Sequence, residues 1–243
     1  MSTMADLRVL YRLAVAPVRG RTHAERMESF YGVQANDYDS FRERLLPGRQ
    51  YLCEQLPLRD GAVWVDLGGG TGANLEFVRD WIPRLAKVYV VDLSSSLLEV
   101  ARERSEKYGW SNVETVVADA TRFEPPESAD IVTCSYSLTM IPDWFAAIEH
   151  ANRFLKPGGT FGAVDFYVSR KHPEPGYERH SWFTRTLWPT WFAFDNVHLS
   201  PDHVRFLHRT FQCQRFLESR TRLPYVPFVR APWYSFLGRK REE

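Results

Sequence analysis

A glycine cluster preceded by an acid could bind a nucleotide-like ligand. The run D-L-G-G-G-T-G occupies residues 66–72 and follows an apolar, valine-rich stretch. Glycines let the backbone turn sharply and approach a ligand closely, and the free amides of a following helix would point at that ligand. Gly68, Gly70 and Ala73 also suit the dinucleotide pattern G-x-G-x-x-G/A, so the glycines alone do not identify the ligand. Asp66, however, places a negative charge where a pyrophosphate would be repelled and an ammonium attracted.

Further acids follow the next apolar runs. Asp92 ends the run 87–92 and lies twenty residues beyond Gly72, the separation expected for an acid that binds ribose hydroxyls. Asp119 ends the third run, and 129–136 is a fourth predicted strand whose end would line a reaction site. Each acid alone could be a helix cap. Three acids at the carboxyl ends of successive strands instead favour a ligand site along that edge of the sheet.

The form D-x-G-x-G-x-G resembles the first motif of class I methyltransferases that use S-adenosylmethionine, and L-K-P-G-G at 155–159 resembles a later motif of that family. The alternative is a glycine-rich turn in another α/β protein. The resemblance implies that Asp66 and the glycine backbone hold the amino acid end of the cofactor. It further implies that Asp92 holds the ribose and that Asp119 or its neighbour meets the adenine amino group. The implied cofactor-binding residues are Tyr38, Asp66, Gly68, Gly69, Gly70, Asn74, Asp92, Leu93, Asp119, Ala120 and Ser135.

Alternating strand and helix patterns predict the elements that position these residues. They imply an α/β, Rossmann-like fold with a mostly parallel seven-stranded sheet and helices on both faces. We expect a helical lid and possible membrane-contact segment over 1–50, and a methyltransferase domain over 51–243 with an aromatic insertion at about 169–199. Helices are expected at about 49–56, from near Ala73, at 94–109, from about 141 to 155 and near 201–211, and late strands at 160–168, 213–221 and 225–236.

Three segments have more than one interpretation. Residues 4–16 carry an apolar stripe flanked by arginines, which could lie in a membrane interface or pack on the domain. Tyr31 and Tyr38 follow a capping box at 22–25 and are candidates for a lid over the cofactor, or are simply half-buried tyrosines. The six tryptophans and phenylalanines of 182–194 suggest a substrate pocket, an interfacial surface or a cap on the core.

Charge and cysteine content narrow the class of protein. The net charge of +1 combines about +2 over 1–30, −7 over 31–204 and +6 over 205–243, which suggests contact with an anionic partner or a solvated basic tail. Three scattered cysteines argue against a disulfide framework and a zinc site, and we expect no metal. No apolar run is long enough to cross a bilayer and no secretory signal is evident. We therefore expect a cytoplasmic, peripherally membrane-associated protein that does not bind nucleic acid.

Three segments narrow the resemblance further. Residues 17–20, 23–31 and 229–234 are similar to the N-methyltransferases of betaine lipid synthesis. The likeness implies conversion of diacylglycerylhomoserine to diacylglyceryl-N,N,N-trimethylhomoserine by three methyl transfers from S-adenosylmethionine. The domain that builds the homoserine lipid is not found in this sequence, so a separate aminocarboxypropyl transferase would supply the lipid substrate at a membrane surface.

This chemistry requires an amine lone pair aligned with the methyl group, and aromatic faces that can hold the final cation. Tyr31, Tyr38 and Tyr136 are the catalytic candidates, and Arg42 and His180 are candidate partners for the substrate carboxylate, although His180 could be a plain surface histidine. Three alternatives stay open: a methyltransferase for a quinone or small amine, a non-catalytic cofactor-binding subunit, and a nicotinamide dehydrogenase.

Overall fold

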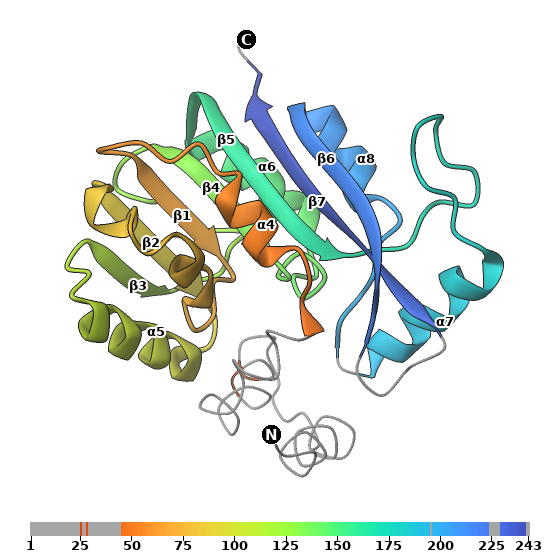
Figure 1. The fold of residues 1–243 in the computed structure, drawn as a ribbon, viewed down its shortest axis with the longest axis horizontal. Coiled ribbons are helices and arrows are strands. Elements are labelled where there is room, and N and C mark those ends of the chain that lie inside the picture. The colour runs from red at the N-terminus through yellow and green to blue at the C-terminus, as the bar shows by residue number, and fades with distance from the viewer. Residues whose placement is uncertain (1–24, 26–27, 29–44, 195, 224–228, 242–243) are drawn as a thin grey trace.

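One seven-stranded sheet organises the chain (Figure 1). The structure is a computed structural model that describes residues 25, 28, 45–194, 196–223 and 229–241. Neighbouring strands follow the order β3-β2-β1-β4-β5-β7-β6. The first five strands pair in parallel, and β7 is antiparallel to both β5 and β6, so the predicted mostly parallel sheet is confirmed. The strands are β1 Val63–Leu67, β2 Lys87–Asp92, β3 Val113–Val117, β4 Ala129–Ser135, β5 Leu155–Phe166, β6 Phe211–Arg222 and β7 Arg230–Lys240.

Helices cover both faces of this sheet, as predicted. Alternate residues of β1 belong to two separate apolar clusters, because successive side chains of a strand point to opposite faces. One cluster contains side chains from α4, α5 and α7, and the other contains side chains from α6 and α8. The helices are α4 Arg49–Glu54, η1 Ala73–Val78, η2 Ile82–Arg84, α5 Ser95–Tyr108, α6 Trp144–Phe154, α7 Trp182–Ala193 and α8 His203–Thr210.

Local contacts define both ends of helix α5. Ser94 Oγ accepts a hydrogen bond of 3.3 Å from the Leu97 N–H at the start of the helix. At the other end Gly109 adopts a left-handed conformation, with φ of 68°, and caps the last turn. Because β2 ends at Asp92, the start of α5 lies at the carboxyl edge of the sheet.

The segment after the glycine cluster differs from the prediction. We expected one helix from near Ala73, whereas the chain forms two short 3₁₀ helices, η1 and η2. Pro83 has no N–H and its ring excludes a continuous α-helix across this segment, and no side chain caps the start of η1. Strand β5 also begins earlier than expected, at Leu155 rather than residue 160, with a register shift opposite Ala129 and Ile131.

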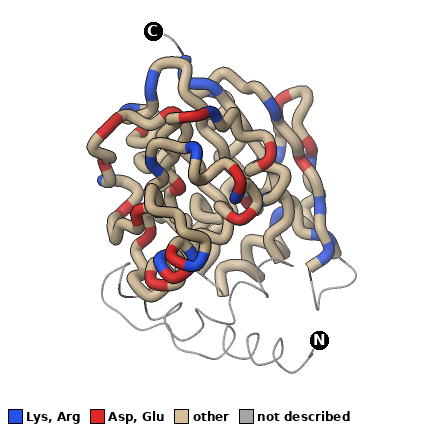
Figure 2. The backbone as a smooth tube through the Cα atoms, turned by 60° about the vertical axis from the view of Figure 1, so that its left-hand side comes forward, with Lys and Arg blue, Asp and Glu red and all other residues tan. Residues whose placement is uncertain are grey.

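The aromatic insertion contains α7, which lies beside one end of the β6–β7 hairpin (Figure 1). The Trp188 indole N–H donates a hydrogen bond of 3.0 Å to the Arg230 carbonyl oxygen and fixes this placement. Acidic and basic positions are interspersed over most of the described chain (Figure 2). None of the helices in the described ranges is long and apolar enough to cross a membrane. The proposed division near residue 50 stays a prediction, and its N-terminal part lies almost wholly outside the described residues.

Candidate functional site

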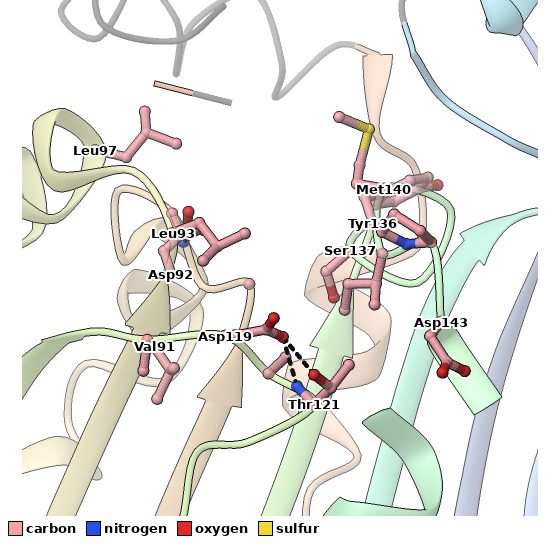
Figure 3. Close-up of a pocket in the computed structure, with 16 residues that line it drawn as sticks. Val91, Asp92, Leu93, Leu97, Asp119, Thr121, Tyr136, Ser137, Met140 and Asp143 are labelled. Carbon is pink, nitrogen blue, oxygen red and sulfur yellow. Dashed lines mark hydrogen bonds between the residues drawn. The ribbon is translucent and has the colours of Figure 1, made fainter. Parts of the chain in front are cut away.

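A cavity of about 920 Å³, including the part open to solvent, lies at the carboxyl ends of β1, β2 and β4. Figure 3 shows Asp92, Leu93 and Asp119 on one side of this space and Tyr136, Ser137 and Met140 on the other. Ligands of open α/β sheets bind at this edge. The lining residues are Gly68, Gly70, Val91, Asp92, Leu93, Leu97, Ala118, Asp119, Ala120, Thr121, Tyr136, Ser137, Met140, Ile141, Pro142 and Asp143.

The glycine cluster forms the floor of the cavity because it can approach its neighbours more closely than other residues. Gly68 and Gly70 have φ values of 68° and 55°, in the left-handed region that favours glycine. A Cβ atom at Gly68 would lie 2.3 Å from the Ser137 Cβ, so the loop after β1 and the segment after β4 touch there. A Cβ at Gly70 would meet nothing closer than 3.7 Å, and the backbone there is open toward the cavity.

Asp92 connects this glycine loop to the end of β2. Its Oδ2 accepts a hydrogen bond of 3.0 Å from the Gly70 N–H, and its Oδ1 accepts one of 2.9 Å from the Ser94 N–H. A carboxylate oxygen has more than one lone pair, so an acid at this position suits the hydroxyls of a ribose. The loop geometry therefore suits the predicted role of this residue.

Asp119 lies at the far end of the same cavity and is exposed. Its Oδ1 accepts hydrogen bonds of 2.8 Å from both the N–H and the Oγ1 of Thr121 (Figure 3). No described residue bonds to Oδ2, which is left for a donor on a ligand. The wall that carries the two acids is otherwise apolar and suits the faces of an aromatic base; it consists of Val91, Leu93, Leu97, Ala118 and Ala120.

Four predicted cofactor residues lie beneath the cavity rather than on its surface. The clearest is Asp66, which is fully buried and lines no cavity. Its Oδ1 accepts a hydrogen bond of 2.6 Å from Thr133 Oγ1, and its Oδ2 accepts one of 2.9 Å from Asn74 Nδ2. Both Asp66 oxygens therefore bond to neighbouring side chains, and the expected contact between Asp66 and the cofactor ammonium stays a prediction. The other three residues are Gly69, Asn74 and Ser135.

The network around Asp66 supports the glycine loop from below. Burial raises the pKa of Asp66, and the bonds from Thr133 and Asn74 counteract this shift. Asn74 Oδ1 accepts a 2.9 Å bond from Arg49 Nε on α4, a cation that the sequence analysis missed. A Cβ at Gly69 would lie 3.0 Å from Asp66 Oδ2, so this carboxylate packs directly against the loop. Asp66 thus supports the glycine loop from within the core.

Tyr136 is brought to the cavity in an unusual backbone conformation, with φ of 54°. Its hydroxyl donates a bond of 2.7 Å to the Pro47 carbonyl oxygen, and its ring contacts Phe166 with centroids 4.9 Å apart. Burial raises the pKa of Tyr136 well above its ordinary value. The phenol is therefore neutral and occupied as a donor, which leaves only the ring as a surface for a ligand.

Of the two predicted substrate residues, Arg42 and His180, the structure describes His180. His180 lies away from this cavity, with its Nδ1 accepting a 2.9 Å bond from the Ser169 N–H. Burial lowers the pKa of His180 to about 4, so the ring is neutral, and its Nε2 lies 3.5 Å from Glu178 Oε2. His180 is buried, so the alternative of a surface histidine is wrong, and its role toward the substrate stays a prediction. Tyr31, Tyr38 and Arg42 lie outside the described residues.

The segment between β4 and α6 supplies most of the lining that the sequence analysis missed. Ser137, Met140 and Asp143 belong to it, and Asp143 also caps α6 by accepting a 3.1 Å bond from the Ala146 N–H. The sequence did contain a clue to this segment, because it follows a buried parallel strand, as the segments after β1 and β2 do. Its residue types alone, however, match an ordinary loop.

One described residue of the N-terminal part contacts this region. Ser94 Oγ donates a bond of 2.8 Å to Glu28 Oε2, and the Ser96 hydroxyl donates to Glu28 Oε1. Burial raises the pKa of Glu28, but the bonds from Ser96 and Ser94 outweigh it and the net shift is downward. Glu28 is therefore ionised and attached to the start of α5, two residues beyond Asp92.

Known proteins with similar sequences include methyltransferases. A methyltransferase-domain family matches residues 65–159. The ubiquinone/menaquinone biosynthesis C-methyltransferase UbiE of Hydrogenovibrio crunogenus is 26% identical over 149 residues, which cover 58% of this chain and 59% of the relative. The enzyme of the same name from Neisseria meningitidis is 29% identical over 163 residues, which cover 63% of this chain and 64% of the relative. The match thus spans about three fifths of the length of these relatives.

Solved structures share the fold at lower identity. One is an N-methyltransferase of Haemonchus contortus in complex with phosphomonomethylethanolamine and S-adenosylhomocysteine. It is 18% identical with a TM-score of 0.61, and the match covers 80% of this chain and 52% of that one. A SAM-dependent methyltransferase from Aquifex aeolicus is 16% identical with a TM-score of 0.58, and the match covers 85% of this chain and 97% of that one. At this identity the likeness concerns the fold alone.

Proposed function

Because residues 65–159 form a class I S-adenosylmethionine-dependent methyltransferase domain, we propose that this protein methylates the amine of a lipid headgroup. The specific reaction proposed is conversion of diacylglycerylhomoserine to diacylglyceryl-N,N,N-trimethylhomoserine in three steps. The resemblance of residues 17–20, 23–31 and 229–234 to betaine lipid N-methyltransferases supports this acceptor. Peripheral attachment to a membrane, and a separate aminocarboxypropyl transferase that supplies the lipid, belong to the same proposal.

The charge of the cavity is the observation that favours an amine acceptor. The described lining contains three carboxylates, Asp92, Asp119 and Asp143, and no Lys, Arg or His. Such a cavity attracts cations and repels anions. A sulfonium cofactor and a quaternary ammonium product both carry a fixed positive charge, whereas a phenolate acceptor would be disfavoured.

The residues present fit the cofactor. Gly70 leaves an open approach to the backbone, the Asp92 carboxylate suits the ribose hydroxyls, and the apolar wall that carries Asp92 and Asp119 suits the adenine. When bound, S-adenosylmethionine supplies an electrophilic methyl group, which an amine lone pair takes as the sulfonium becomes a thioether. The protein supplies position and charge rather than a covalent intermediate.

In this proposal the acceptor amine binds in the same cavity. An ammonium has no lone pair, so the acceptor must lose a proton before each transfer, and nearby carboxylates oppose that loss by stabilising the cation. Asp119 is exposed at the mouth, so water can reach the cavity and carry the proton away. The Tyr136 ring offers the growing cation an aromatic face. Tyr31, Tyr38 and Arg42 keep their proposed roles as lid and carboxylate partners.

A second candidate is methylation of carbon on a quinone-type acceptor. Its support is the name of the curated relatives, which are ubiquinone/menaquinone C-methyltransferases. The acidic lining weighs against it, because carbon methylation of a phenol is promoted by forming the phenolate.

A direct assay separates these candidates. Purified protein is incubated with S-adenosylmethionine and either diacylglycerylhomoserine or a demethylated quinone, both in detergent micelles, and the lipids are analysed by mass spectrometry. We expect mono-, di- and trimethylated homoserine lipid in sequence. Methylation of the quinone alone would overturn the proposal. Cofactor binding by calorimetry without turnover on either acceptor would instead identify a non-catalytic subunit.

A further inference from the structure

Helix α7 exposes large aromatic side chains that a protein in water would ordinarily bury. The exposed fractions are 72% for Trp182, 53% for Phe183, 47% for Trp191 and 80% for Phe194. Single exposed apolar residues are common, but a cluster of this kind usually marks a binding surface. All four lie on one helix or at its C-terminal cap.

The spacing of these residues gives α7 a second apolar face. Phe183, Trp191 and Phe194 are separated by eight and three positions, so they form one stripe along the helix. Leu187 is partly buried and packs against the core. The inward face is already occupied, because Trp188 and Phe192 are buried against the core. The outer stripe therefore does not contribute to folding the described part of the chain.

Positive charge lies next to this helix. Arg230 is beside α7, as its carbonyl accepts the Trp188 indole N–H, and Arg222 is its partner in the β6–β7 register. Both arginines are exposed, and no acid of the described residues pairs with either. Helix α7 itself carries one arginine and no acid. Aromatic rings bordered by unpaired arginines are complementary to an anionic lipid surface.

This surface is connected to the reaction cavity. Phe192 on the inner face of α7 contacts Phe166 with ring centroids 4.7 Å apart, and Phe166 contacts Tyr136 at 4.9 Å. The carboxyl ends of β5 and β6 lie at the same edge of the sheet as those of β1 and β2, and α7 lies at that edge too (Figure 1). A bilayer against α7 would thus lie on the cavity's end of the molecule.

We propose that the outer stripe of α7, together with Arg222 and Arg230, docks the protein on an anionic lipid bilayer. This inference rests on the proposed lipid acceptor and names the surface through which the membrane is reached. Trp and Phe enter the interfacial region, where rings of this size are favoured, and the arginines contact anionic headgroups. Attachment is reversible, because only a few side chains insert and the charge contribution is screened by salt.

Vesicle sedimentation of the full chain tests this surface. Phosphatidylcholine vesicles are compared with vesicles that also contain phosphatidylglycerol, for the wild type and for the double variant Trp191→Ser/Phe194→Ser. We expect the double variant to lower the partition coefficient roughly tenfold or more on both kinds of vesicle. Arg222→Gln/Arg230→Gln should lower it about fivefold per charge on the anionic vesicles only.

Matched variants keep the test decisive. Phe145→Ser removes an aromatic ring that is 42% exposed on α6, at the opposite face of the sheet, and should leave vesicle binding unchanged. Phe194→Ser alone removes a ring with almost no packing, and it should still weaken binding even if the double variant unfolds. Thermal unfolding verifies that each variant is folded.

Two results would overturn the inference. One is vesicle binding that survives the α7 changes and disappears when residues 1–44 are deleted, which would assign attachment to the N-terminal segment. The other is a change from dimer to monomer in the α7 variants without any effect on vesicles, which would assign the stripe to a second copy of this chain. Methylation of acceptor in micelles is measured separately, so failure of the docking surface and failure of the proposed reaction remain distinguishable.

Discussion

Asp92 Oδ2 accepts a hydrogen bond of 3.0 Å from the Gly70 N–H, and this contact fixes the glycine loop to the end of the neighbouring strand. The two residues are 22 positions apart and line the same cavity. One carboxylate therefore both shapes the loop and lines the ligand cavity. This double role makes Asp92 the most sensitive single position for cofactor binding.

We expect Asp92→Ala to weaken S-adenosylmethionine binding about 100-fold, because hydrogen bonds to a charged group contribute about 1.5–3 kcal/mol each and two would be lost. Asp92→Asn keeps one acceptor and should lose less. Isothermal titration calorimetry measures both. The control is Asp80→Ala, which removes the same group at a side chain that is 95% exposed. An Asp92→Ala protein that is folded and binds the cofactor as tightly as the wild type would contradict this placement of the ribose.

A second prediction concerns Asp165, a fully buried carboxyl group next to the loop that carries Met140. Thr139 donates to it through N–H at 3.1 Å and through Oγ1 at 2.8 Å. Burial raises the pKa of Asp165 to about 7, although the bonds from Thr139 and the backbone counteract part of that shift. The folded state therefore holds a proton that the unfolded state releases near pH 4.

This difference makes stability fall as pH rises from about 4 to about 7, by up to about 4 kcal/mol for this one group. Asp165→Asn cannot ionise and should remove that component. Buried His180 and His203 have lowered pKa values and act in the opposite direction, but they are present in both proteins and cancel in the comparison. Urea unfolding of wild type and variant across this pH range gives the difference, with Asp80→Asn as the exposed control. Parallel pH profiles for wild type and Asp165→Asn would show that Asp165 is ionised throughout.

The central parallel strands could be predicted from the sequence because β1, β2 and β4 are short apolar runs with a clear stop. The ends of α5 were equally readable, since Ser94 and Gly109 act through local contacts with neighbouring backbone. The same reasoning brought Asp92 and Asp119 to one edge, as each follows a parallel strand. These are short-range signals combined with one rule of topology.

The depth of each acid below the surface could not be predicted in this way. Asp66 and Asp92 both end a strand in the sequence pattern, yet only Asp92 lines the cavity. The difference arises from Thr133 and Asn74, which lie 67 and 8 residues from Asp66 and close over its carboxylate. The position of His180 could not be predicted for a related reason, because two hydrogen bonds with Ser169 hold it away from the cavity lining. Long-range packing of this kind leaves no mark on the residues immediately around an acid or a histidine.

The contact of Glu28 with α5 gives the last prediction, since it joins the N-terminal part to the helix that begins beside the cavity. Glu28 accepts from Ser94 and Ser96, and Ser94 in turn bonds to Asp92. Because the net pKa shift of Glu28 is downward, the contact contributes above its ordinary pKa of 4.5 and is lost as pH falls below it. Glu28→Gln removes the charge, and we expect the cofactor to dissociate roughly fivefold faster, as loss of about 1 kcal/mol implies.

Stopped-flow displacement of S-adenosylhomocysteine measures this rate. Glu99→Gln is the matched control, because Glu99 lies on the same helix and its described ion pair is with Arg102. A double-mutant cycle with Ser96→Ala tests whether the two side chains act together: coupling is expected if Glu28 is bound to Ser96 in solution. Strictly additive effects of the two changes would mean that this contact does not restrain the cofactor.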